Sequence, residues 1–160
     1  MIAIDIDSRA VFRQAVLTAL DAAIERGARR IVCVDRDFAD WPLEATELHA
    51  SLAAWLRRPQ RQLVLLAAGY DPLVRTHPRF SEWRADWMHA IDARVPAEAG
   101  PHEWPTLLLD DGPVCLSVWQ RDPWRGRAAV DAVAAHAARD RIDAELQRSA
   151  PGWPARPLGL

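Results

Sequence analysis

The feature that most constrains the fold is a stretch near residue 110 that predicts a β-hairpin. A short apolar run at 106–109 leads into Asp110-Asp111-Gly112-Pro113, which is typical turn chemistry. After the turn, Val114, Leu116 and Val118 alternate with Cys115, Ser117 and Trp119. Two strand-like runs joined by a tight turn are expected to pair antiparallel. The hairpin therefore commits the chain to a β-sheet, which other elements must cover.

Before the hairpin, strand-like and helix-like patterns alternate. The runs that suit strands lie at 2–6, 30–34, 63–68 and, more weakly, 93–95. Helical periodicity is found at 8–26, 43–58, 77–91 and 128–149. The sequence therefore predicts an α/β fold with a mixed, mainly parallel sheet flanked by helices. We expect one domain over residues 1–150 and an irregular tail over 151–160, where prolines interrupt regular structure.

Composition excludes several kinds of function. The formal net charge of the 160 residues is −2, so binding to nucleic acid would need a local basic patch. All 20 basic residues are arginines and the sequence has no asparagine, which excludes a P-loop lysine, a Schiff-base lysine and Asn-linked glycosylation. Cys33 and Cys115 are expected to be buried free thiols. With no leader and no long apolar segment, we expect a cytoplasmic protein without membrane contact or cofactor.

Aromatic residues and histidines in the 77–91 stretch allow two further predictions. Phe80, Trp83 and Trp87 recur at helical spacing, which predicts that they form a core face. His77 and His89 have no partner at metal-binding spacing, so they are expected to be surface or capping residues.

The hairpin resembles the catalytic hairpin of phospholipase D-like proteins, whose motif is His-x-Lys-x4-Asp followed by Gly-Ser on the next strand. With Asp110 at the aspartate position, Glu103 takes the histidine position, Pro105 the lysine position, and the Gly-Ser pair falls on Ser117 and Val118. The chain also resembles an uncharacterised bacterial domain of this type that in some proteins follows an N-acetyltransferase domain and lacks the catalytic pair. The resemblance implies a phospholipase D-like half-domain in a bacterial, non-catalytic member.

The residues at the motif positions agree with loss of catalysis. Glu103 is a poor nucleophile toward a phosphodiester, and Pro105 has no side-chain donor for a phosphoryl oxygen. His102 lies one residue off the frame, and only a register shift would bring it onto the motif face. We therefore assign no catalytic residue and favour an interaction or dimerisation module. In the family, two half-domains meet about a twofold axis, which implies a homodimer through the hairpin face with Trp104 and Trp119, or a protein partner such as an acetyltransferase.

Two alternatives remain open. The first is an anion or nucleic-acid binder that uses the Trp/Arg loop at 119–127, because residues 121–127 are predicted to form a loop after the hairpin. Aromatic faces would stack on bases and guanidinium groups would bind phosphates, through Trp119, Arg121, Trp124, Arg125 and Arg127. The second is a metal-assisted hydrolase built from loop carboxylates, namely Asp35, Asp37, Asp110 and Asp111. Against the second alternative, Asp110 and Asp111 also suit simple turn residues whose carboxylates accept backbone N–H groups.

Overall fold

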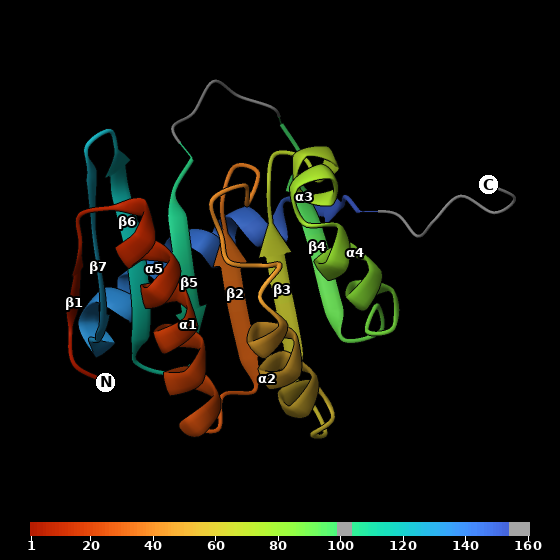
Figure 1. Ribbon diagram of the computed structural model, residues 1–160, viewed down its shortest axis with the longest axis horizontal. Helices are drawn as coiled ribbons and strands as arrows, with labels where there is room; N and C mark the ends of the chain where they lie inside the picture. The colour runs from red at the N-terminus through yellow and green to blue at the C-terminus, as the bar shows by residue number, and fades with distance from the viewer. Residues whose placement is uncertain (99–103, 154–160) are drawn as a thin grey trace, which may run out of the picture.

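The computed structural model describes residues 1–98 and 104–153, and these form one sheet between two helical layers (Figure 1). The strands are β1 (Ile4–Ile6), β2 (Arg30–Val34), β3 (Gln62–Leu66), β4 (Ile91–Pro96), β5 (Thr106–Asp110), β6 (Val114–Arg121), β7 (Trp124–Val130) and β8 (Ser149–Pro151). The helices are α1 (Arg9–Glu25), α2 (Thr46–Leu56), α3 (Asp71–Thr76), α4 (Pro78–Ala85) and α5 (Ala132–Gln147). The strand order is β1-β7-β6-β5-β2-β3-β4-β8.

The α/β class is confirmed, but the prediction of a mainly parallel sheet is wrong. Only the β2–β3 and β3–β4 pairs are parallel among the described strands, and the remaining neighbours are antiparallel. The apolar runs of β2 and β3 indicated strands buried on both faces, which is correct. The short turns between β5, β6 and β7 force those strands to run antiparallel, and this half of the sheet outweighs the parallel part.

Helices α1 to α4 cover one face of the sheet and α5 crosses the other, as Figure 1 shows. Alternation along each strand divides the core accordingly. Cys33, Leu65 and Leu108 point into the larger core with α1 to α4, whereas Val34, Leu66 and Leu107 point toward α5. Each strand residue that faces α5 therefore belongs to a layer covered by a single helix.

Helix α1 begins where its periodicity predicted, and α2 and α5 begin later than expected. Ser8 caps α1 by accepting a hydrogen bond from the Val11 N–H at 3.1 Å. Gly27 follows that helix with φ of 78°, a conformation that favours glycine. The predicted loop at 121–127 is mostly strand β7, so the last helix begins after Asp131, whose carboxylate caps it.

The region around α4 corrects two predictions. Phe80 is buried, but Trp83 and Trp87 are half-buried at the margin of the core. His77 is 3% exposed rather than a surface residue, although it does occupy the cap position between α3 and α4, as the other part of the prediction stated. Its Nε2 lies 2.9 Å from the Phe38 carbonyl oxygen. His77 separates the two helices, because α3 ends at Thr76 and α4 begins at Pro78.

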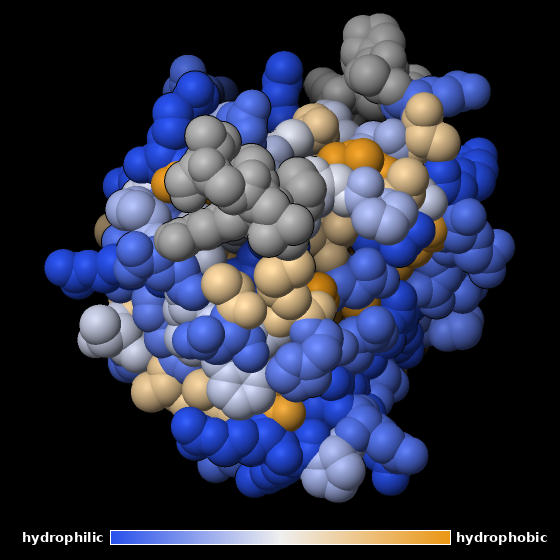
Figure 2. Space-filling model, turned by 90° about the vertical axis from the view of Figure 1, so that its right-hand side faces the viewer, coloured by the Kyte–Doolittle hydropathy of each residue, from blue (hydrophilic) through white to orange (hydrophobic). Residues whose placement is uncertain are grey.

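The C-terminal residues of the described chain pack on the sheet and on α4. Trp153 stacks on Tyr70 with ring centroids 5.1 Å apart, and the Arg84 guanidinium lies 4.0 Å from the Trp153 ring. This side of the molecule is mostly hydrophilic, with a smaller band of hydrophobic residues across its middle (Figure 2). Cys33 and Cys115 are buried and free, as predicted. Among the described residues, no helix is both long and apolar enough to cross a lipid bilayer.

Candidate functional site

A groove of about 1380 Å³ lies between α5 and one end of the sheet. Its sheet side is formed where β2, β3 and β4 end and β5 begins, so it lies at the carboxyl ends of the parallel strands. Ligand sites in α/β proteins are commonly found at this position, where strand order changes direction. The lining residues are Val34, Arg36, Leu66, Ala68, Val95, Pro96, Ala97, Glu98, Trp104, Pro105, Leu107, Arg141, Ile142, Ala144, Glu145 and Arg148.

The groove combines an apolar floor with a charged margin. Arg36 follows β2, and Arg141 lies on α5, on the opposite wall. Neither guanidinium has an ion pair within residues 1–98 and 104–153. Arg148 is paired with Glu145 at 2.6 Å, so much of its charge is already balanced. The groove therefore holds two guanidinium groups without ion pairs, together with the carboxylate of Glu98, around an apolar floor that Trp104 also lines.

The described positions of the phospholipase D-like motif do not lie together. Pro105, at the lysine position, is exposed and lines the groove. Ser117 pairs with Leu107, another lining residue, and its side chain is half-buried. Glu103, at the histidine position, lies outside the described residues, as does His102. Two of the motif positions therefore lie at or beside the groove.

Asp110 lies at the other end of the sheet, opposite Ile31 at the start of β2. Its carboxylate accepts hydrogen bonds from the Gly112 N–H at 2.9 Å and the Val114 N–H at 3.0 Å. Burial raises the pKa of Asp110, although the two N–H donors oppose the shift. Asp111 accepts the Arg29 N–H at 3.2 Å. Asp110 therefore stabilises the turn, which confirms the simpler interpretation for that residue, whereas Asp111 links the turn to the segment between α1 and β2.

The structure does not bring the four candidate metal carboxylates together. Asp35 and Asp37 follow β2 at its carboxyl end, whereas Asp110 and Asp111 lie beside the start of that strand. Across the described ranges, no group of three or more His, Cys, Asp and Glu side chains is placed to hold a metal ion. The carboxylate cluster on which the metal-assisted hydrolase depended is therefore absent from this part of the chain.

Asp35 instead belongs to a buried charge network on the α1 face of the sheet. It is fully buried and accepts hydrogen bonds from Thr106 Oγ1 at 2.5 Å and the Phe38 N–H at 2.8 Å. Arg121 donates to Asp35 through Nη2 and to Asp40 through Nη1 at 2.7 Å. The network ties the end of β6 to the loop after β2. Its charged groups are already paired, because Arg121 forms ion pairs with both Asp35 and Asp40.

The predicted Trp/Arg loop is divided between the two faces of the sheet. Arg121 is held in the Asp35 network, and Trp124 stacks on Phe12 of α1 with centroids 5.2 Å apart. Arg125 and Arg127 alternate with Gly126 and with Ala128, which faces the α1 core, so they point to the α5 face, and both are exposed.

Trp119, at a bulge in β6, is 63% exposed. Of the five predicted residues, Trp119, Arg125 and Arg127 remain accessible to a ligand.

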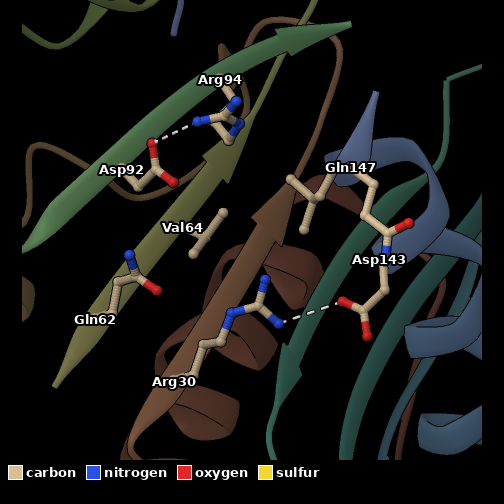
Figure 3. A pocket seen from close by; sticks show the side chains of 8 residues that line it. Arg30, Gln62, Val64, Asp92, Arg94, Asp143 and Gln147 are labelled. Atoms are coloured by element: carbon tan, nitrogen blue, oxygen red, sulfur yellow. Dashed lines mark hydrogen bonds and ion pairs between the residues drawn. The ribbon is translucent and has the colours of Figure 1, made fainter. Parts of the chain in front are cut away.

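A second hollow, of about 390 Å³, lies farther along the α5 face and is shown in Figure 3. Arg30 reaches from β2 toward Asp143 of α5, at 3.3 Å, and Arg94 lies 3.3 Å from Asp92 on the same strand. Arg94 also donates to the Ser149 hydroxyl at 2.6 Å. Because its arginines are already paired, this hollow holds less uncommitted charge than the groove.

Sequence reasoning missed the two arginines of the groove. Arg36 was predicted to lie in a loop after a strand, but the candidate ligands there were its acidic neighbours. Arg141 lies in the predicted helix at 128–149 but outside its apolar stripe, and nothing in that pattern distinguishes it from other exposed arginines. The one available signal was the rule that ligands bind beyond the carboxyl ends of parallel strands, which points to the loop containing Arg36.

Comparison with known proteins shows a likeness of fold. No protein-family model matches the chain, and no curated protein is significantly similar in sequence. Among solved structures, TrmBL2, an archaeal chromatin protein described as showing a novel mode of DNA binding, superposes with a TM-score of 0.62 at 11% identity over 94% of this chain. The match covers 55% of TrmBL2, so this chain spans about half the length of that protein.

NucT from Helicobacter pylori superposes with a TM-score of 0.56 at 7% identity, covering 95% of this chain and 98% of NucT. At these identities the likeness establishes the fold and nothing further. This chain therefore shares its α/β fold with both NucT and part of TrmBL2.

Proposed function

We propose that this chain is a non-catalytic, phospholipase D-like domain that binds the phosphodiester backbone of nucleic acid in the groove. The observation that carries the proposal is the pairing of Arg36 and Arg141, both without an ion pair in the described chain, across an apolar floor beside Trp104. The description of TrmBL2 as a DNA-binding protein adds support, since its fold is similar.

The chemistry of the groove suits binding better than cleavage. A guanidinium group donates two parallel hydrogen bonds to phosphate oxygens, and arginines on opposite walls can hold neighbouring phosphates. The Trp104 indole provides a face on which a base can stack. At the lysine position, Pro105 contributes no donor to neutralise a phosphoryl oxygen. The groove thus retains contacts for a ground-state phosphodiester without the groups that would stabilise its transition state.

Titration of a fluorescent oligothymidylate with the protein tests this proposal. The observed affinity should fall as salt rises from about 50 to 200 mM, because bound counterions are released from the phosphates. Replacing Arg36 or Arg141 by Ala should each weaken binding about tenfold, as loss of a charge-assisted contact does. Arg58→Ala provides a matched control, because it removes the same charge from an exposed position after α2, on the opposite face. Equal affinity in all variants would refute the assignment to the groove.

A homodimer through the hairpin face is the second candidate function, and exposed apolar side chains favour it. Trp119 is 63% exposed and Val133, at the start of α5, is 82% exposed. Trp119, at the end of β6 in the hairpin, offers a large apolar side chain that would be covered in such a contact. Light scattering at micromolar concentration distinguishes a dimer from a monomer of 17.9 kDa. A monomeric mass at every concentration would exclude the dimer, and a dimer unaffected by Trp119→Glu would place the contact elsewhere.

A further inference from the structure

Trp119, Arg125 and Arg127, the accessible residues of the predicted Trp/Arg loop, lie on the two strands next to the groove wall. Strand pairing aligns Thr106 with Val118, and Pro105 on the groove wall and Trp119 are the next residues beyond that pair on their two segments. In the next row, Leu107 pairs with Ser117, and Ser117 pairs with Arg127. Neighbouring strands are about 4.8 Å apart, which places Arg127 roughly 10 Å from the groove wall. We call Ser117, Trp119, Arg125 and Arg127 the β6–β7 strip.

The strip carries groups that are only weakly engaged within the protein. Arg125 is exposed and forms no ion pair with another described residue. Arg127 lies 3.5 Å from Asp5, whose side chain is 89% exposed, and such an exposed pair adds little to stability. Ser117 is half-buried between them and the groove. The fold therefore leaves two guanidinium groups exposed on the α5 face beyond the groove, and the exposed indole of Trp119 at the bulge of the neighbouring strand β6.

Resting on the proposed function, we infer that the β6–β7 strip is a second contact region for the same ligand, and that this ligand is a single strand several nucleotides long. Exposed aromatic and arginine side chains on an open sheet stack on unpaired bases and bind the adjoining phosphates. A duplex keeps its bases stacked on one another, so it offers neither Trp104 nor Trp119 a free base face. A mononucleotide is too short to contact both the groove and the strip.

Length dependence tests the inference. Fluorescent trithymidylate and an oligothymidylate of about ten nucleotides, a length within the range of single-strand sites, are titrated into wild type, Trp104→Ala and Trp119→Ala. Trp104→Ala should weaken both ligands about tenfold, because stacking on an aromatic side chain contributes at least fivefold per base. Trp119→Ala should weaken only the longer strand, by about the same factor. Arg125→Ala should repeat the Trp119→Ala result and reduce the salt dependence of the longer strand alone.

The possible results separate failure of the inference from failure of the proposed function. If Trp104→Ala weakens both ligands while Trp119→Ala and Arg125→Ala weaken neither, the groove stands and the strip is refuted. If Trp104→Ala changes neither ligand, the proposed function fails. Equal affinity for a duplex of the same length would also overturn the inference. So would a dimeric mass that Trp119→Glu reduces to that of a monomer, because the strip would then be a subunit interface.

Discussion

Replacing Arg121 by Ala should destabilise the protein, although a surface arginine at the end of a strand would normally be dispensable. The Asp35 side chain is 1% exposed, and Arg121 is its only cationic partner among the described residues. Removing one partner of a buried ion pair typically costs about 3–5 kcal/mol, because the other charge stays buried and uncompensated. Thr106 and the Phe38 N–H still donate to Asp35, at 2.5 and 2.8 Å, and Arg121 itself is 36% exposed. We therefore expect the lower end of that range, about 3 kcal/mol.

Urea unfolding followed by tryptophan fluorescence measures this loss. The matched control is Arg127→Ala, because Arg127 also pairs with an aspartate, but both side chains are more than half exposed. That control should change the free energy of unfolding by less than about 0.5 kcal/mol. A double replacement with Asp35→Asn should recover part of the loss, since the buried charge is removed with its partner. An Arg121→Ala variant as stable as the control would refute a structural role for the network.

Three further predictions concern stability. Burial lowers the pKa of His77, so the unfolded chain binds more protons below pH of about 6.5, and stability should fall as the pH drops through that range. Denaturation at several pH values should show a shallower dependence for His77→Gln than for the wild type. Gly126→Ala would place a Cβ 2.6 Å from the Ser117 carbonyl oxygen, and should cost on the order of 1–3 kcal/mol in a urea titration. Asp110→Ala leaves two N–H groups of the hairpin turn without acceptors and should cost about 2 kcal/mol, whereas Asp110→Asn, which keeps an oxygen, should cost less in thermal unfolding.

The sequence predicted the elements whose pattern is local. The hairpin of β5 and β6 follows from apolar alternation around a turn, and Asp110 serves that turn as its position indicated. Strand β7 was missed because Gly126, between Arg125 and Arg127, is a poor strand former. Their strand conformation comes from pairing with β6, which local propensity does not encode.

The sequence could not predict the parts of the site that depend on distant residues. Arg121 and Asp35 are 86 positions apart, so their pairing was invisible and Arg121 was interpreted as an anion-binding residue. The groove likewise joins Arg36 after β2 with Arg141 on α5, and these meet only because α5 crosses the sheet. By contrast, the exposure of Arg125 and Arg127 agrees with their predicted availability to a ligand.

The central claim is that the groove binds a single strand without cleaving it, and one experiment measures both properties. A fluorescent oligothymidylate of about ten nucleotides is incubated with excess protein, its anisotropy is recorded, and the same sample is then separated on a denaturing gel. The account predicts high anisotropy that falls as salt is added, with the strand intact with or without added divalent cations. Fragments that accumulate with protein and time would contradict the non-catalytic assignment, and an anisotropy equal to that of the free strand would contradict the binding function itself.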